Sequence, residues 1–381
     1  ILHLQERRMI RLFVRKDVYR RFMSCLVYIP RDRFTTKLIG KMQRILLTEF
    51  NASEASFSTR FSSSVLAQIH YVVRLKSAEK ADFNIKEIEN KLIAVGETWG
   101  DGLIKSIVGF YGEEQGHAIV NEYQYAFSAG YRERFTPAVA LNDIGFIQGL
   151  ADKEKSLAMN AYKTVSSVSN IVCLKLYRRH ETVPLSDALP MLENMGLRVI
   201  EENPYALTLD DNQQIWINDF KMLCKETVAE NFNATKDVFQ NTFYQVWQGE
   251  AENDILNTLS LYSKLDWRQI SVLRAYAKYI RQIGTAFSKA YIFQALIAHS
   301  NIAQLLIEYF FVKFDPVFNA SRRQKDLQAI ENKFFSLLEK VSSLDEDRIL
   351  RLYISVIKAT VRTNYFQKKE GRYAEYFSFK F

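Results

Sequence analysis

The cluster best suited to chemistry in this sequence is Arg31-Asp32-Arg33, which directly follows Pro30. It lies where a predicted strand ends and a predicted helix begins. Carboxylate-bearing ligands bind well at helix N-termini, and arginines can donate paired hydrogen bonds to them. A structural alternative is that Asp32 caps the helix while the arginines cover it or contact another domain. We therefore treat Arg31, Asp32 and Arg33 as a possible effector or interface site.

A second candidate is the pair Glu113 and His117, whose spacing places a carboxylate and an imidazole on one helical face. A metal site needs at least one more ligand, so a solvated helix end is the favoured interpretation. The other histidines have no metal-type partner near them in the sequence, namely His3, His70, His180 and His299. We predict no metal ligands.

Catalytic and cofactor signatures are missing from the sequence. No Gly-x-Gly-x-x-Gly motif follows a strand, and no Gly-Lys-Ser/Thr phosphate loop is present. Many carboxylates could pair for acid–base chemistry, but no spacing singles any of them out. We therefore predict no catalytic and no cofactor-binding residues in this chain.

Two segments share one pattern of predicted elements. The first has strands over 10–14, 22–29, 54–61 and 65–75, helices over 35–50 and 85–95, and a short turn at 62–64. The second has strands over 171–177, 197–200, 205–209 and 215–223, a helix over 184–194, a turn at 210–212 and a helix from about 227. This order is the ferredoxin-like plan, with helices on one face of an antiparallel sheet. The repeat is one of pattern and not of residue identity.

The remaining segments are predicted to be helical. Residues 97–157 form a glycine-rich helical connector. Helices are then expected over 227–248, 253–262, 267–284, 286–298, 301–313, 321–341 and 345–362. Asp266 and Gln269 have the spacing of a capping box, in which each side chain bonds the other's backbone N–H.

Composition indicates a globular chain. The 381 residues are 48% hydrophobic and 25% charged, and no run of about 18 apolar residues predicts a membrane span. No signal peptide is visible, and three scattered cysteines fit a reducing compartment, so we expect a cytoplasmic protein. The net charge of +8 is dispersed and lacks an aromatic-interleaved basic motif, so no nucleic-acid partner is expected.

Several stretches resemble the large bacterial NAD-specific glutamate dehydrogenases, very long chains with ACT-like modules before the catalytic domain. These stretches occur in the family's order and cover nearly the whole chain: Arg11-Leu-Phe-Val-Arg-Lys-Asp17, Phe22 to Phe34, Pro184 to Ile200, Trp247-Gln-Gly-Glu-Ala-Glu252, Leu265 to Gln282, Arg362-Thr-Asn-Tyr-Phe366 and Ser378-Phe-Lys-Phe381. In such proteins the last stretch leads into the catalytic domain. The chain also begins at Ile1 without methionine, so we expect an internal segment of a longer protein.

The resemblance implies an organisation and a function. We expect an α+β fold with two ferredoxin-like (ACT-like) modules, a helical connector and a C-terminal all-helical block. The expected ranges are 1–96 for the first module, 97–158 for the connector, 159–225 for the second module, 226–370 for the helical domain and 371–381 for the start of the catalytic domain. The parent enzyme would use NAD to convert L-glutamate to 2-oxoglutarate. This segment would itself be inactive and would serve in regulation and in assembly of a homo-oligomer. Its expected partners are other copies of itself, its own catalytic domain and a possible amino-acid effector. The alternative is a purely structural spacer.

Overall fold

A computed structural model of the protein describes residues 9–19, 21–62, 64–76, 83–151, 156–163, 170–210, 213–374 and 376–381. The turns predicted at 62–64 and 210–212 include Ser63, Asp211 and Asn212, which lie outside the described residues. The chain divides into two compact units. The first comprises residues 1–124 and 135–141, and the second comprises residues 125–134 and 142–381.

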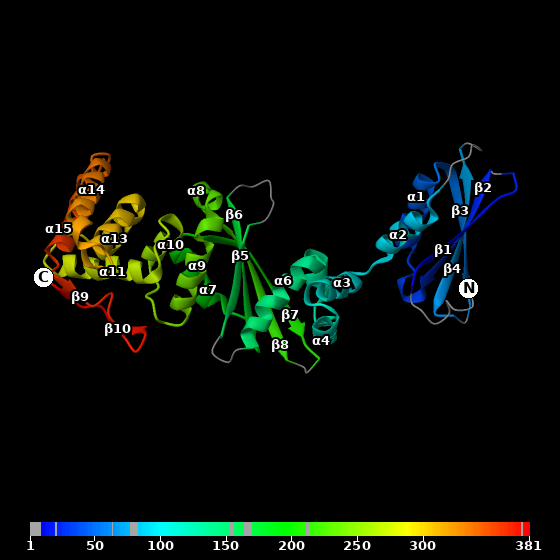
Figure 1. Ribbon diagram of the computed structural model, residues 1–381, viewed down its shortest axis with the longest axis horizontal. Helices are drawn as coiled ribbons and strands as arrows, with labels where there is room; N and C mark the ends of the chain where they lie inside the picture. The colour runs from blue at the N-terminus through cyan, green and yellow to red at the C-terminus, as the bar shows by residue number, and fades with distance from the viewer. Residues whose placement is uncertain are drawn as a thin grey trace. The chain divides into compact units, whose positions relative to one another are not determined.

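The first unit begins with a four-stranded antiparallel sheet in the order β1-β2-β4-β3. Its strands are β1 (Arg11–Lys16), β2 (Phe22–Pro30), β3 (Ala52–Phe61) and β4 (Leu66–Leu75). Two helices, α1 (Thr36–Glu49) and α2 (Ile85–Gly96), lie together on one face of this sheet (Figure 1). All four predicted strands and both predicted helices of this segment are confirmed.

Alternation along β2 explains how this module forms its core. Met23, Cys25, Val27 and Ile29 are buried against the helices because successive side chains point to opposite faces of the sheet. The phenol of Tyr71 on β4 donates a hydrogen bond of 3.0 Å to the backbone carbonyl of Ile39 on α1. The core of this module is therefore shared between one sheet face and two helices.

The connector is helical with breaks, as predicted. Its helices are α3 (Trp99–Tyr111), α4 (Glu113–Tyr123), α5 (Ala129–Arg134) and α6 (Pro137–Gln148), followed by the short 3-10 helix η3 (Gly149–Ala151). Gly112 separates α3 from α4 at a φ of +80°, a conformation that favours glycine. A Cβ on Gly116 would lie 3.0 Å from the Cα of Val108, so the two helices pack closely at this point.

The second module, in the second unit, has the same strand order as the first, β5-β6-β8-β7. Its strands are β5 (Ala158–Tyr162), β6 (Ile171–Arg179), β7 (Arg198–Thr208) and β8 (Gln214–Leu223), and its helices are α7 (Leu185–Asn194) and α9 (Phe232–Trp247). Two details differ from the prediction. The five-residue edge strand β5 was not predicted, and the two strands predicted over 197–200 and 205–209 are one strand, β7. Pro204 does not interrupt β7, because an edge strand tolerates a residue without a backbone N–H.

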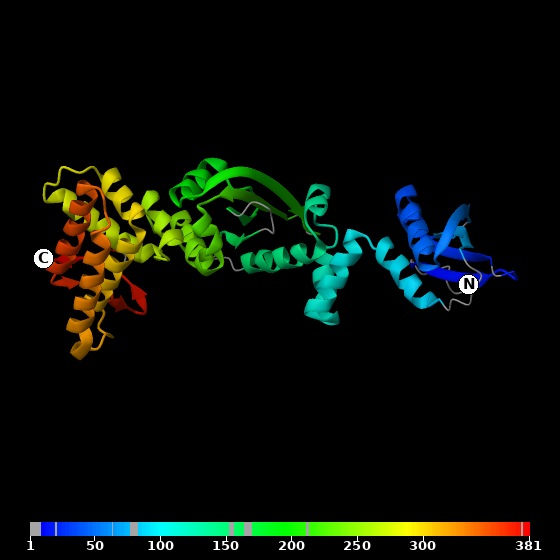
Figure 2. The ribbon, with the colours of Figure 1, turned by 90° about the horizontal axis from the view of Figure 1, so that it is seen from above.

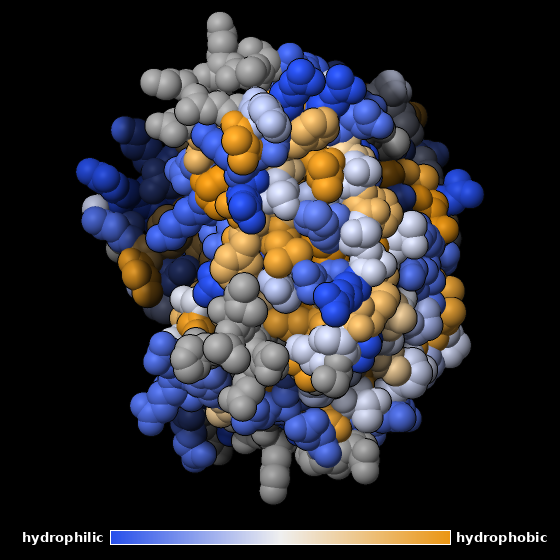
Figure 3. Space-filling model, turned by 90° about the vertical axis from the view of Figure 1, so that its right-hand side faces the viewer, coloured by the Kyte–Doolittle hydropathy of each residue, from blue (hydrophilic) through white to orange (hydrophobic). Residues whose placement is uncertain are grey.

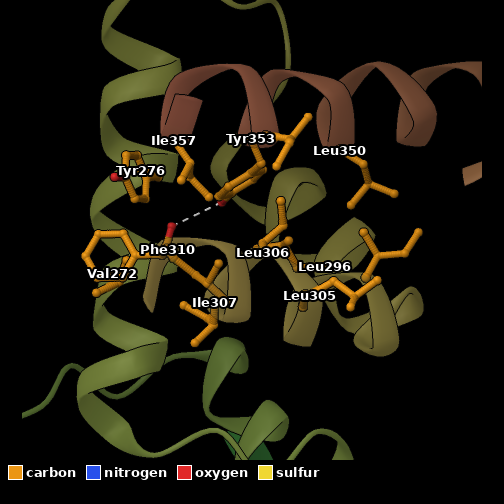
Figure 4. Packing of buried hydrophobic residues seen from close by; sticks show 14 of the residues in the cluster. Val272, Tyr276, Leu296, Leu305, Leu306, Ile307, Phe310, Leu350, Tyr353 and Ile357 are labelled. Atoms are coloured by element: carbon orange, nitrogen blue, oxygen red, sulfur yellow. Dashed lines mark hydrogen bonds between the residues drawn. The ribbon is translucent and has the colours of Figure 1, made fainter. Parts of the chain in front are cut away.

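A helical block follows the second module. Its elements are the 3-10 helix η4 (Ile255–Thr258), α10 (Leu259–Tyr262), α11 (Trp267–Gln282), α12 (Lys289–Ala298), α13 (Ser300–Phe314), α14 (Ala320–Leu338) and α15 (Leu344–Ala359). The short helix α8 (Glu226–Glu230) directly precedes α9 and packs in the core of the second module. Large side chains from α11, α13 and α15 point toward one another in its core, among them Tyr276, Phe310 and Tyr353 (Figure 4). The expected α+β fold with two ferredoxin-like modules, a helical connector and a C-terminal helical block is therefore confirmed.

The end of this block differs from the prediction in detail. The helix predicted to reach residue 362 ends at Ala359, because residues 362–363 form β9 (Arg362–Thr363). This strand pairs with β12 (Phe379–Lys380) in an antiparallel arrangement. Between them lies a second small hairpin of β10 (Lys368–Lys369) and β11 (Arg372–Tyr373).

Among the described residues, no single helix has the length and apolar character needed to cross a membrane. By length and composition alone, α12 and α13 satisfy that test as a pair bent by 96°.

The capping box predicted at the start of α11 is confirmed and supports a stability prediction. The backbone N–H of Gln269 donates 2.9 Å to the Asp266 carboxylate, and the Asp266 N–H donates 2.9 Å to the Gln269 side chain. Replacing Asp266 by alanine should lower the free energy of unfolding of the helical block by about 1 kcal/mol, because one backbone N–H loses its acceptor. Urea denaturation measures this loss. Asp266→Asn keeps an acceptor oxygen, so an equal loss in both variants would contradict a capping role.

Candidate functional site

The predicted cluster Arg31-Asp32-Arg33 forms a 3-10 helix, η2 (Arg31–Arg33), between β2 and α1. Thr35 caps α1, since its hydroxyl oxygen accepts from the backbone N–H of Leu38. The N-cap of α1 is therefore Thr35 and not Asp32. The guanidinium of Arg31 lies over the ring of Phe61, 5.4 Å from its centroid.

Arg33 joins the first module to the start of α3. Its guanidinium donates 2.9 Å to the Asp101 carboxylate and 3.3 Å to the carbonyl of Gly96 at the end of α2. Burial raises the pKa of Asp101, but hydrogen bonds from Thr98 and the charge of Arg33 outweigh it and hold the pKa below its ordinary value. This corner is a fixed ionic contact, and whether it also binds an effector stays a prediction.

The second candidate, Glu113 and His117, lies exposed in the first turns of α4. Within the described ranges, no group of three or more histidine, cysteine or acidic side chains is placed to hold a metal ion. The three cysteines are free and buried, and burial raises the pKa of the Cys25 thiol to about 12.

A buried polar network that sequence reasoning missed lies on the second sheet. The ammonium group of Lys175 on β6 donates 2.5 Å to the carboxylate of Asp143 on α6, and both side chains are almost fully buried. Tyr177 donates 2.8 Å to the same carboxylate, and Tyr131 on α5 donates to it as well. Burial, followed by the charge of Asp143, raises the pKa of both tyrosines far above their ordinary value, so they remain hydrogen-bond donors.

The network has a second carboxylate at its edge. Asp219 on β8 accepts 2.8 Å from Tyr162 and lies 3.7 Å from the Arg134 guanidinium. Burial raises the pKa of Asp219, against the opposing effects of Tyr162, Lys175 and Arg134. Arg134 also pairs at 2.7 Å with Glu201 on β7.

These polar contacts hold α5 and the later part of α6 on the sheet face that α7 and α9 leave open. Phe146 on α6 stacks on Tyr177 with the ring centroids 5.5 Å apart. Both faces of β6 are therefore buried, which is why seven consecutive residues from Ile171 are buried. This run of seven residues, in which Lys175 is the only charged one, is the sequence signal that could have predicted helices on both faces of the second sheet. Figure 2 shows α6 running along this sheet.

A third site joins the helical block to the C-terminal segment. The guanidinium carbon of Arg268 on α11 lies 3.9 Å from the centroid of the Tyr373 ring, and this side chain donates 3.1 Å to the carbonyl of Tyr365. A hollow of about 900 Å³ adjoins it, bordered by both acidic and basic side chains, including Glu252 and Lys278. Its mixed charge singles out no ligand class.

Comparisons with known proteins bear on the whole chain. Five family models match in sequence order: "Glutamate dehydrogenase, ACT2 domain" over 11–100, "Glutamate dehydrogenase, helical motif 2" over 106–150, "Glutamate dehydrogenase, ACT3 domain" over 156–235, "Glutamate dehydrogenase, helical motif 3" over 251–316 and "Bacterial NAD-glutamate dehydrogenase, catalytic domain" over 333–381. The chain resembles a segment of the large bacterial NAD-specific glutamate dehydrogenases. The resemblance inferred from the quoted motifs is therefore confirmed.

Curated relatives carry the same description. A protein named NAD-specific glutamate dehydrogenase from Halomonas elongata is 39% identical over the whole chain, and one from Pseudomonas aeruginosa is 37% identical over the whole chain. One from Mycobacterium tuberculosis is 34% identical over 97% of the chain. The chain spans only 23% or 24% of the length of these relatives.

Proposed function

We propose that this chain is a non-catalytic regulatory and assembly segment of an NAD-dependent glutamate dehydrogenase. The whole protein would convert L-glutamate and NAD to 2-oxoglutarate, ammonia and NADH. The observation that carries this proposal is the order of the matches, in which two ACT domains and two helical motifs precede a catalytic-domain match that begins only at residue 333. The chain itself has neither a dinucleotide-binding glycine motif nor a phosphate loop.

The proposal includes a cytoplasmic homo-oligomer in which the two modules bias the activity of the catalytic domain. A ligand does this when it binds one arrangement of the subunits more tightly than another. The Arg31-Asp32-Arg33 corner is the proposed place for an amino-acid effector or a subunit contact, because Arg33 already links the first module to α3. A ligand carboxylate that competed with Asp101 for Arg33 would loosen that link.

An activity assay tests the non-catalytic part of the proposal. The purified chain is mixed with L-glutamate and NAD, and NADH formation is followed by its absorbance, with the full-length enzyme as the positive control. We expect no NADH from the chain and steady production from the full-length enzyme. Turnover by the chain alone would contradict a non-catalytic segment.

The alternative is a structural oligomerisation spacer that binds no small molecule. Calorimetry of the chain against a panel of amino acids separates the two functions. Heat of binding that disappears in Arg33→Ala but persists in Arg44→Ala, on the exposed side of α1, supports the effector site. If no amino acid in the panel gives a heat of binding, the structural spacer is favoured.

A further inference from the structure

The face of the first sheet opposite α1 and α2 is open. In the described part of the first unit no helix covers it, and Figure 3 shows hydrophobic surface among hydrophilic residues on that side. Phe13 on β1 is 39% exposed and Val72 on β4 is 37% exposed, while Leu26 and Tyr28 on β2 are half-buried. Phe13 packs edge-on against Tyr28 at 5.9 Å. An apolar strip of this kind in the middle of a sheet face is typical of a contact surface.

The charge around this strip is positive. A hollow of about 650 Å³ on the face is lined by residues that include Arg15, Arg60 and His70, and the His70 imidazole forms a hydrogen bond of 2.7 Å with the Ser24 hydroxyl. Among the described residues, no carboxylate lines the hollow. A matching partner therefore has an apolar centre and acidic residues beside it. A second copy of the same face would bring like charges together and fits poorly.

The second module shows what covers the equivalent face there. The registers of the two sheets correspond. The pair Leu26–His70 on β2 and β4 of the first sheet therefore has the same position as the pair Lys175–Asp219 on β6 and β8 of the second sheet. On the second sheet this position is covered by α6, whose Asp143 bonds Lys175. The cover comes from the helical motif that directly precedes the module in the chain, residues 106–150 before residues 156–235.

The same order suggests the cover of the first sheet. The matched descriptions number the first module here as ACT2 and the connector as helical motif 2, which implies a preceding helical motif. We propose that a helix of the same polypeptide, preceding residue 1, lies across the open face of the first sheet. Its apolar side contacts Phe13 and Leu26, and its carboxylates meet Arg15 and Arg60. This inference rests on the proposed function, because it needs the longer parent chain.

Zero-length crosslinking of the full-length enzyme tests the identity of the cover. Arg60→Lys places an amine at the rim of the hollow, and a carbodiimide joins that amine to any carboxylate in contact with it. We expect a peptide from before residue 1 to be linked to position 60, and not to position 44 in the matched variant Arg44→Lys on α1. A link to residues 1–381 of another copy, or to a protein other than the enzyme, overturns the proposal.

Thiol labelling tests whether the face is covered at all. Ser58→Cys, on the exposed side of β3 within the hollow, should react at least tenfold more slowly in the full-length enzyme than in the 381-residue chain. Glutamate-dependent NADH formation is measured on the same full-length sample. If the Ser58→Cys thiol reacts at equal rates in the 381-residue chain and in an active full-length enzyme, the proposed covering helix is ruled out and the proposed function still stands. If the native full-length enzyme is inactive, the proposed function is ruled out.

Discussion

Replacing Asp143 by alanine is expected to lower the free energy of unfolding of the second module by about 3–5 kcal/mol, because the Lys175 ammonium group would remain buried without its carboxylate. The two tyrosines that donate to Asp143 would lose their acceptor at the same time. Hydrogen exchange of the β6 and β8 amides measures the local stability. We expect these amides to exchange much faster in the variant.

A double variant separates the contribution of the buried charges to the free energy of unfolding from the contribution of packing. Asp143→Leu combined with Lys175→Met removes both charges and fills similar volume, so most of the lost stability should return. A loss below about 1 kcal/mol in Asp143→Ala would contradict a buried ion pair, since removing one partner of such a pair is strongly destabilising. Asp187→Ala, an exposed carboxylate on α7, serves as the matched control and should change little.

The second large effect is expected at Phe310 on α13. Its ring is fully buried and lies 5.4 Å from Tyr365 and 6.3 Å from Phe379, beside the strands β9 and β12. Replacing it by alanine should lower the free energy of unfolding of the helical block by about 3–5 kcal/mol through lost burial and the cavity left behind. Urea denaturation followed by circular dichroism measures the change.

The control for this prediction is Phe335→Ala on α14, because that ring is 36% exposed. Its loss should be about 1 kcal/mol or less. Phe310 contacts aromatic residues within the stretch that matches the catalytic-domain family model, so its removal should also loosen that stretch. Unchanged hydrogen exchange at residues 362–366 in Phe310→Ala would show that the aromatic cluster does not hold this segment.

Local patterns predicted most elements of both modules. The alternation in β2, the helical spacing in α1 and the capping box at Asp266 depend on neighbours a few residues apart, so the sequence alone reveals them. The prediction failed where an element was short or tolerated an unusual residue. The strand β5 has five residues at a sheet edge, and β7 continues through Pro204 for the same reason of edge position.

The candidate site was predictable only in part. Arg31-Asp32-Arg33 was found because its charges and its place before a helix are visible in the sequence, but its contact with Asp101 lies 68 residues away. The Lys175–Asp143 pair joins residues 32 apart on different elements, and neither stands in a recognisable motif. The only sequence signal for this buried ion pair is a single lysine within an apolar run.

The sequence by itself determined the identity of the elements, their order in two similar modules and the lack of nucleotide-binding motifs, because these depend on local spacing and residue type. Only the tertiary structure decided which sheet face is covered. The second sheet has helices on both faces, joined on one side through Asp143, while no helix in the described part of the first unit covers Phe13 and Leu26 on the first sheet. Such differences arise from contacts between segments distant in the chain, which residue spacing does not encode.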